Sequence, residues 1–447
     1  MPPPADIRSR LDLLASRKRQ RDVLIDEVRG GAIAGISTAA EFFAGRAEQG
    51  RDARATIVAG AEIAEGPGGR CFVVRGEFAP NGDGLPMAGC APVDGAGLPL
   101  LTTGEVSSPL AETDIAFVDT ETTGLAGGTG TVAFLVGVGW WEQRGGESRF
   151  VLEQFLIDDF RHEEAMLSRL VARLAPFRAL CTYNGRRFDV PLLRARAVMH
   201  RIAPRAWSRP QIDLLDFSRR LWKGRIGSVS LKNVERHILG IDRGEDIDGG
   251  LIPEVFFRWA RTGEAPLIPA VLRHNAQDIV TLGALLARAS RICADPMGCG
   301  LLNHHAEFAA AAKWFEKRKD PAAARAAWER ALEASRGSQE ERPLLHRLAL
   351  YHKRHGDREE AAAIWRGLPG DNDATIQLAM HLEHRRRDPA EALRIVRGLR
   401  QRLEWEADMA ALRDGGKAAS AAALADLIRR EERLLRKSTR SGDSARG

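Results

Sequence analysis

A short apolar run that ends in two acids constrains this chain of 447 residues more than any other feature. Residues 115–118 (Ile-Ala-Phe-Val) predict a buried strand, and Asp119 and Glu121 follow it in the string Asp-Thr-Glu-Thr-Thr-Gly. Alternate residues of a strand point to the same face, so the two carboxylates lie side by side. Like charges on one face repel unless a cation lies between them. The string therefore indicates a site for a hard divalent cation, which prefers oxygen ligands.

Two further acids stand in comparable strings. Asp189 ends Tyr-Asn-Gly-Arg-Arg-Phe-Asp, after a predicted strand and at the start of a predicted helix. Asp278 ends His-Asn-Ala-Gln-Asp on another predicted helix, where His274 shares its face at a spacing of four residues. Taken singly, Asp189 has the alternative role of a helix cap, and His274 and Asp278 that of a solvated polar face. Taken together, the acids predict a metal-dependent nuclease, because paired metal ions are the usual arrangement for attack on phosphodiesters.

Residues 111–295 predict an α/β domain. Apolar runs predict strands at residues 114–119, 132–141, 149–157, 178–183 and 211–215. Helices are predicted at 163–174 and 190–200, and helical segments fill 216–292. Three strands in succession, followed by alternating helix and strand, predict a mixed five-stranded sheet flanked by helices.

The rest of the chain has a different character. Residues 1–110 predict an N-terminal extension that is partly disordered, with one clear strand at residues 70–75. Residues 300–437 predict an all-α region, because strand patterns end there and Ala, Arg, Glu and Leu dominate. Residues 438–447, rich in Ser, Arg and Gly, predict a disordered tail.

Three stretches of the all-α region share a helix–turn–helix pattern. Their turns contain Asp320, Asp357 and Asp388, which are spaced 37 and 31 residues apart. Tetratricopeptide repeats have a period of about 34 residues, so the region is predicted to be tetratricopeptide-like. A plain helical bundle is the alternative.

The positive charge of the chain is concentrated in the same region. Residues 301–447 contain 29 Lys and Arg against 23 Asp and Glu, whereas residues 1–300 contain 37 of each. A basic surface attracts polyanions, although a solvated helical surface explains the same count. No apolar run reaches membrane-spanning length and the N-terminus lacks the pattern of a secretory signal, so we expect no membrane contact and a cytoplasmic location.

The acidic strings resemble the three exonuclease motifs of the DEDD superfamily, which has a ribonuclease H-like fold. Three longer strings resemble the ribonuclease H-like exonuclease family typified by YprB proteins: Asp-Thr-Glu-Thr-Thr-Gly-Leu-Ala-Gly-Gly-Thr-Gly, Tyr-Asn-Gly-Arg-Arg-Phe-Asp-Val-Pro-Leu-Leu and Arg-His-Asn-Ala-Gln-Asp. The resemblance covers about residues 111–292. It implies a 3′–5′ exonuclease that releases nucleoside monophosphates from a single-stranded 3′ end of RNA or DNA.

The resemblance also implies residue roles. Asp119 would bridge two Mg²⁺ or Mn²⁺ ions, Glu121 and Asp278 would complete one metal site, and Asp189 would hold the second ion. The substrate-binding residues would be Thr122 and Thr123 at the terminal nucleotide and Asn184 and Phe188 at the penultimate one. The C-terminal helices would bind the body of the nucleic acid or a protein partner.

One residue departs from the superfamily pattern. The superfamily has Tyr four residues before the last Asp in one branch and His five residues before it in the other, whereas this chain has His274 at the Tyr spacing. A neutral imidazole accepts a proton from water near pH 7, so His274 is a candidate base whose reach from this position is open. Two other functions stay open as well: a nucleic-acid-binding or adaptor protein that does not cleave, and an endonuclease of ribonuclease H type.

Overall fold

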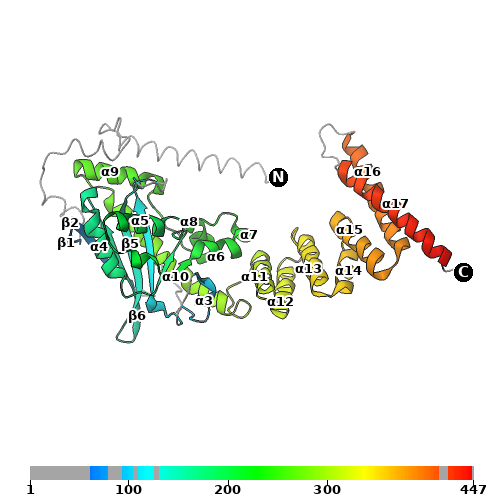
Figure 1. Ribbon diagram of the computed structural model, residues 1–447, viewed down its shortest axis with the longest axis horizontal. Coiled ribbons are helices and arrows are strands. Elements are labelled where there is room, and N and C mark those ends of the chain that lie inside the picture. Colours follow the sequence, from blue (N-terminus) through cyan, green and yellow to red (C-terminus); the bar gives the residue numbers. More distant parts are fainter. Residues whose placement is uncertain (1–60, 79–92, 104–108, 125–129, 412–420, 445–447) are drawn as a thin grey trace. The chain divides into compact units, whose positions relative to one another are not determined.

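The computed structural model describes residues 61–78, 93–103, 109–124, 130–411 and 421–444. The chain divides into two units, Met1–Leu301 and Leu302–Gly447 (Figure 1). The disorder expected in the N-terminal extension falls mainly on residues 1–60, 79–92 and 104–108, which lie outside the described residues. Within the described ranges, no helix is long and apolar enough to cross a bilayer.

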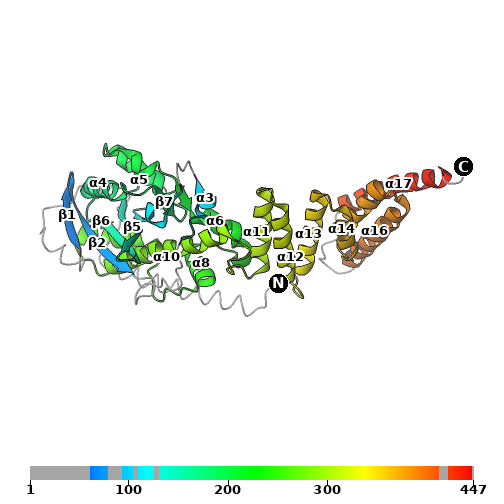
Figure 2. The ribbon, with the colours of Figure 1, turned by 90° about the horizontal axis from the view of Figure 1, so that it is seen from below.

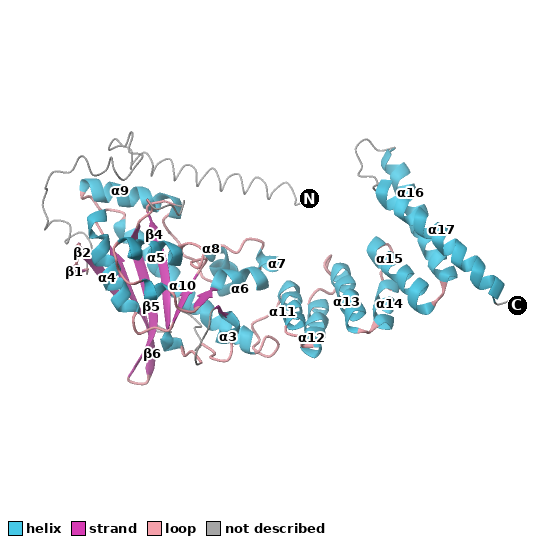
Figure 3. Cartoon of the chain, viewed as in Figure 1, coloured by secondary structure: helices cyan, strands magenta, loops and turns pink. Residues whose placement is uncertain are grey.

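The first unit is built on one mixed sheet of eight strands (Figure 3). Its strands are β1 (Glu62–Gly66), β2 (Gly69–Phe78), β3 (Thr102–Thr103), β4 (Ile115–Thr122), β5 (Ala133–Arg144), β6 (Glu147–Leu156), β7 (Ala179–Thr182) and β8 (Gln211–Asp213). Their spatial order is β1-β2-β6-β5-β4-β7-β8-β3. The pairs from β1 to β4 are antiparallel, β7 and β8 add in parallel, and β3 pairs with β8 antiparallel.

The predicted α/β class and all five predicted strands are confirmed, but the predicted number of strands is wrong. The sheet gains β1 and β2 at one edge and β3 at the other, all from residues before 111. Strand β1 buries only Ala64 of its five residues, and β3 has only two residues, so neither gives a readable apolar pattern. Strand β2 contains the predicted run at 70–75 and pairs with β6, so this part of the extension belongs to the sheet.

Helices cover both faces of the sheet, as Figure 2 shows. Helix α4 (Glu163–Leu174) and helix α5 (Asp189–Met199), which confirm two predicted helices, lie on one face, and α10 (Ile268–Ala294) lies on the other. The other α-helices in the described part of this unit are α3 (Leu98–Leu101), α6 (Leu214–Leu221), α7 (Lys223–Ile226), α8 (Leu231–Val234) and α9 (Ile252–Thr262). A π-helical turn, η5 (Glu235–Leu239), follows α8.

Two glycines of β5 allow α10 to approach the sheet closely. A Cβ atom at Gly137 would lie 2.3 Å from Oδ1 of Asn275, and one at Gly139 would lie 2.5 Å from Cγ2 of Ile279. Both distances are far below a van der Waals contact, so only glycine permits this spacing. As a result, α10 runs directly over β5 and over β4, the strand that carries the first two acids.

The second unit contains helices and no strand in its described residues. Its α-helices are α11 (His305–Lys317), α12 (Pro321–Glu333), α13 (Glu341–His355), α14 (Arg358–Arg366), α15 (Asn372–His381), α16 (Pro389–Ala411) and α17 (Ala421–Ser444). A π-helical turn, η7 (Leu382–Arg386), follows α15. Asp320 and Asp388 accept hydrogen bonds from backbone N–H groups at the starts of α12 and α16, at 3.0 Å and 2.9 Å. The turn acids therefore cap the second helix of two predicted pairs. A tetratricopeptide-like assignment stays a prediction.

The end of the second unit differs from the predicted disordered tail. Helix α17 continues to Ser444, past residue 438, and only residues 445–447 lie outside the described ranges. Leu427 and Leu434 of α17 are buried in a core cluster with Leu399 and Leu403 of α16. This apolar face anchors the helix, and the final residues continue its hydrogen-bonded turns.

Candidate active site

The first two acids lie at the end of β4, on the face that α10 covers. Asp119 pairs in register with Gly137, the residue that makes room for α10. The side-chain amide of Asn275 donates a 2.9 Å hydrogen bond to Oδ2 of Asp119. Gln154 of β6 in turn donates to Oδ1 of Asn275 at 2.9 Å. The orientation of the Asp119 carboxylate is thus fixed by a chain of buried amides.

Helix α10 brings His274 and Asp278 to these acids. Nε2 of His274 lies 3.8 Å from Oε1 of Glu121 and 3.8 Å from Oδ2 of Asp278. The side chain of His274 is only 8% exposed, and its Nδ1 lies 2.8 Å from Oδ1 of Asp246. His274 therefore reaches the acids from its spacing of four residues, with one ring nitrogen held by Asp246 and the other facing the carboxylates.

Asp189 approaches β4 from another direction. Thr120 lies between Asp119 and Glu121 on the strand, so its side chain points to the opposite face, and its hydroxyl donates to Oδ1 of Asp189. The alternative role of Asp189 as a helix cap is wrong, because Phe188 occupies the cap position of α5 and Asp189 is the first helical residue.

The loop before Asp189 is fixed by Asp213, the last residue of β8. Oδ1 of Asp213 accepts hydrogen bonds from the backbone N–H groups of Asn184 at 2.8 Å and Leu215 at 3.1 Å. Asn184 has a φ of 67°, and a Cβ atom at Gly185 would lie 2.6 Å from Cβ of Thr182. The short polar side chain and the glycine are thus needed for the tight turn that leads to α5.

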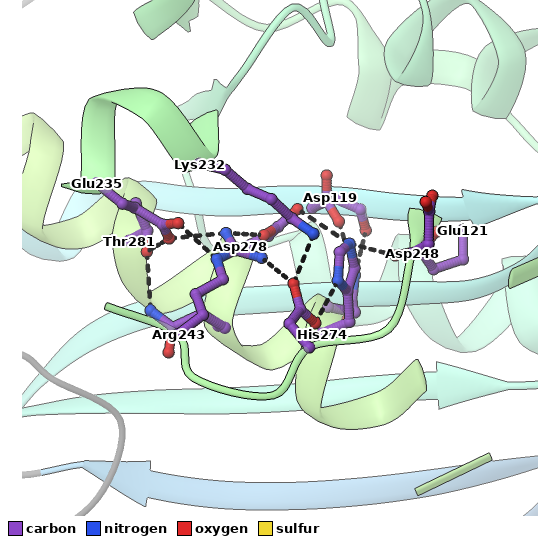
Figure 4. Close-up of polar contacts among 12 residues, drawn as sticks. Asp119, Glu121, Lys232, Glu235, Arg243, Asp248, His274, Asp278 and Thr281 are labelled. Carbon is purple, nitrogen blue, oxygen red and sulfur yellow. Dashed lines mark hydrogen bonds and ion pairs between the residues drawn. The ribbon is translucent and has the colours of Figure 1, made fainter. Parts of the chain in front are cut away.

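A cationic network that the motifs did not predict borders the acids. Arg243, in the loop between η5 and α9, is 8% exposed and donates to Asp278, to Asp246 at 3.3 Å and to both carboxylate oxygens of Glu235. Figure 4 shows Arg243 reaching between Asp278 and Glu235. Lys232 adds a 2.7 Å contact to Asp246. Arg243 and Asp246 lie in a loop without apolar periodicity. Its high density of charged residues is the one sequence feature that could have indicated them.

Burial and mutual repulsion dominate the protonation of the acids. Burial, followed by the charges of Asp278 and Glu121, raises the pKa of Asp119 well above its usual range. Burial raises the pKa of Glu121 to about 8, although the nearby His274 opposes the shift. Burial likewise raises the pKa of Asp189 to about 6, against the hydrogen bond from Thr120. The folded protein thus disfavours full ionisation of these carboxyl groups when no cation lies between them.

In the pair formed by His274 and Asp246, hydrogen bonds and charges outweigh the effect of burial on the pKa values. Burial lowers the pKa of His274, but the hydrogen bond to Asp246 and the charges of Asp278 and Glu121 outweigh it and raise the value above the usual one. Burial alone would raise the pKa of Asp246, yet hydrogen bonds from His274 and Lys232 hold it well below its usual range. Asp246 is therefore a carboxylate at neutral pH, paired with the imidazole.

The donor set of the cluster fits a hard divalent cation. Four carboxylates that repel one another supply the oxygen ligands that Mg²⁺ and Mn²⁺ prefer. Within the described ranges, no group of three or more acidic, histidine or cysteine side chains stands ready to hold an ion. Arg243 contacts only Oδ1 of Asp278, and Thr120 contacts only Oδ1 of Asp189, so each carboxylate keeps its second oxygen for a cation.

The predicted substrate residues fall into two groups. The hydroxyl of Thr122 donates to the carbonyl of Gly124 at 3.0 Å, and that of Thr123 accepts from the backbone N–H of Val132 at 3.0 Å. Both side chains therefore shape the loop after β4, of which residues 125–129 lie outside the described part of the chain. Phe188 is 55% exposed, so its ring is accessible to a ligand.

Asn184 lines an open cavity of about 440 Å³ beside the loop that leads to Asp189. Its polar lining comes from Tyr183, Asn184, Arg219, Ser228 and Ser230. The tyrosine hydroxyl donates to the carbonyl of Val229 at 2.5 Å and ties the two sides of the cavity together. The guanidinium of Arg219 is half-exposed, and its contact with Asp216 is long, at 3.9 Å. It is therefore accessible to an anionic ligand.

Replacing Gly137 by alanine is expected to disturb the site indirectly, through Asn275. The added methyl group must displace Asn275, and with it α10, away from β4. We expect the free energy of unfolding to fall by about 1–3 kcal/mol. The rate of the expected phosphodiester hydrolysis should fall about 100-fold. Thermal unfolding and steady-state hydrolysis would measure both effects, with Gly249→Ala as the control because nothing lies within 4 Å of a Cβ there. A Gly137→Ala protein with the full rate would show that close approach of α10 is not needed.

Comparison with known proteins agrees with this geometry. A family model described as the RNase H superfamily matches residues 116–290, the stretch that contains all four acids. The uncharacterized protein YprB of Bacillus subtilis (strain 168) is 33% identical over 290 residues, which cover 63% of this chain and 68% of that protein. The chain belongs to the YprB family. Its fold is that of the RNase H superfamily, a nuclease-type fold, and the predicted family resemblance is confirmed.

Proposed function

We propose that this member of the YprB family is a metal-dependent 3′–5′ exonuclease that hydrolyses single-stranded nucleic acid. The observation that carries the proposal is the partly buried cluster of Asp119, Glu121, Asp189 and Asp278. Burial and the charges of neighbouring carboxylates raise the pKa of the first three. A protein has little reason to maintain such repulsion unless a cation relieves it. The cytoplasmic location stays a prediction.

The same four carboxylates would hold two Mg²⁺ or Mn²⁺ ions. Bound ions of this kind lower the pKa of an attacking water and stabilise negative charge on the leaving oxygen. The part of the protein is to orient the carboxylates: Asn275 fixes Asp119, and Arg243 holds Asp278 until its oxygen is needed for a ligand. Without metal, this ion pair offsets part of the negative charge of the cluster.

His274 is the proposed general base. A neutral imidazole with its proton on Nδ1, donated to Asp246, keeps the Nε2 lone pair directed at the carboxylates, where the reacting water would lie. Asp246 acts through His274 by fixing its tautomer and ring orientation. Both the ring nitrogen and its carboxylate partner are in place before substrate binds.

Single-stranded substrate suits the residues around the acids. An exposed aromatic ring such as Phe188 can stack on an unpaired base, and base–aromatic stacking contributes about 1–3 kcal/mol per base. The cavity beside Asn184 offers hydroxyl groups and Arg219 for a sugar and phosphate. We therefore expect Asn184 and Phe188 to contact the nucleotides next to the cleaved bond.

Substitution of Asp246 by asparagine should slow hydrolysis without removing metal binding. An amide cannot accept the Nδ1 proton as strongly, so His274 loses its fixed orientation, and we expect about a 10- to 100-fold lower turnover. The exposed Glu245 of the same loop provides the control Glu245→Gln. Equal turnover in both variants would remove Asp246 from the proposed mechanism.

A metal titration followed with a labelled single-stranded oligonucleotide tests the proposed function. The proposal predicts hydrolysis that begins with added Mg²⁺ or Mn²⁺ and stops with a chelator. Binding of the oligonucleotide without hydrolysis under every metal would instead favour a protein that no longer cleaves.

A further inference from the structure

An open cavity of about 560 Å³ lies among α11, α12 and α13 of the helical unit. Its polar lining consists of four cations, one acid and one indole: Lys313, Lys317, Arg347, Arg354, Glu316 and Trp328. The cations come from two different helices, α11 and α13, so the fold rather than local sequence brings them together.

The single acid of the cavity does not balance its cations. Oε1 of Glu316 accepts from the indole N–H of Trp328 at 2.9 Å, and Oε2 lies 3.0 Å from the guanidinium of Arg354. Among the residues that the structure describes, Lys313, Lys317 and Arg347 have no carboxylate partner within ion-pair distance. Three positive charges therefore face one open space without a counter-ion.

The repulsion among these cations favours the binding of an anion. Lys313 and Lys317 are four residues apart on one face of α11, where like charges destabilise a helix. Burial, and then the charge of Arg347, lower the pKa of Lys313. An oxyanion in the cavity would relieve both repulsions at once.

We propose that this cavity binds phosphate groups of a single-stranded nucleic acid, as a contact separate from the nuclease site. The choice of nucleic acid rests on the proposed function. Lys and Arg side chains are the usual partners of backbone phosphates. Trp328 is 2% exposed and its N–H is already bonded, so the cavity offers no ring for base stacking and reads no sequence. A protein partner usually needs an aromatic anchor in a pocket, and the apolar part of this lining is limited to Leu350 and the buried Trp328.

The test is the binding of a single strand of about 40 nucleotides, with chelator present, to the full chain carrying Lys313→Gln and Arg347→Gln. The matched control removes the same charge from Arg358 and Arg385, two exposed residues of the same unit without a carboxylate partner in the described residues. Each lost phosphate contact on a single strand should flatten the slope of log affinity against log salt by about 0.7. At 0.1 M salt this corresponds to about 25-fold weaker binding for two contacts.

The expected result is weaker binding with a flatter salt dependence in the cavity variant and near-wild-type binding in the control. Because two repelling charges are removed, the cavity variant should melt no lower than the wild type. Equal affinities of the two variants would overturn the proposal. The proposal would also be overturned if the cavity variant still bound the nucleic acid but lost the binding of oligoglutamate that the wild type shows. That result would indicate an acidic protein partner. Loss of inorganic phosphate binding alone would indicate a free-anion site. The assay requires no hydrolysis, so an inactive wild type would contradict the nuclease proposal and leave this one standing.

Discussion

Asp119→Asn is expected to reduce metal-dependent hydrolysis at least about 10,000-fold, the loss typical when one member of a catalytic unit is removed. Asparagine has nearly the same shape, and its amide oxygen can still accept the hydrogen bond from Asn275. The substitution therefore removes a metal ligand and a negative charge while keeping the local packing. Rates at saturating Mg²⁺ and Mn²⁺ would measure the effect, with exposed Asp373→Asn as the control.

The same substitution is expected to raise the stability of the metal-free protein. Burial and neighbouring carboxylates raise the pKa of Asp119, and they bring that of Glu121 to about 8 and that of Asp189 to about 6. The folded state thus binds more protons than the unfolded state, so the free energy of unfolding falls as pH rises from about 5 to 8. The raised pKa of His274 acts in the same direction.

Melting temperatures measured between pH 5 and 8 should show a loss of stability with rising pH in the metal-free wild type. The loss should be smaller in Asp119→Asn. Added Mg²⁺ should restore the wild type at the higher pH, because binding to the folded state stabilises it. Full hydrolysis by Asp119→Asn would refute the assigned role of this carboxylate. A flat pH profile of wild-type stability would refute the charge repulsion on which the metal assignment rests.

His274→Ala is expected to lower turnover about 100- to 10,000-fold, the range for loss of a general base. The ring lies 3.8 Å from Glu121 and Asp278 and is oriented by Asp246, so its removal leaves the water without a proton acceptor. The wild-type rate should fall at acid pH as the imidazole becomes charged, and this limb should vanish in the variant. The exposed His237 supplies the control His237→Ala.

His274→Tyr should recover part of the lost rate, because Tyr has this spacing in one branch of the DEDD superfamily that the motifs resemble, and Tyr can orient the water. Wild-type rates in His274→Ala between pH 6 and 9, at saturating metal, would show that the carboxylates alone carry catalysis. Such a result would reduce the His274–Asp246 pair to a structural role.

The sheet shows how far the sequence could predict the fold. Strand β5 could be predicted because its first nine residues form one buried, mostly apolar run, and β6 because its last seven residues are buried. The missed strands β1 and β3 have exposed faces or two residues, and they form only because the neighbouring strands β2 and β8 offer them edges. Their signal lies in tertiary pairing, which no local pattern contains.

The site follows the same division. Asp119, Glu121 and Asp278 could be predicted because each lies in a regular element whose period fixes its direction. Arg243 and Asp246 could not, because their loop between η5 and α9 has no period and meets α10 only through tertiary packing. The glycines that bring α10 to β5 were hidden for a related reason: a missing side chain matters only when its neighbour in space is known.

Digestion of a single-stranded oligonucleotide, labelled in turn at its 5′ and 3′ ends, tests the proposed activity most directly. With Mg²⁺ or Mn²⁺, the wild-type chain should release the 3′ label at once as a mononucleotide. The 5′-labelled strand should shorten one nucleotide at a time, and Asp119→Asn should leave both strands intact. Release of the 5′ label first, cleavage at internal positions, or no hydrolysis with either metal would contradict a 3′–5′ exonuclease.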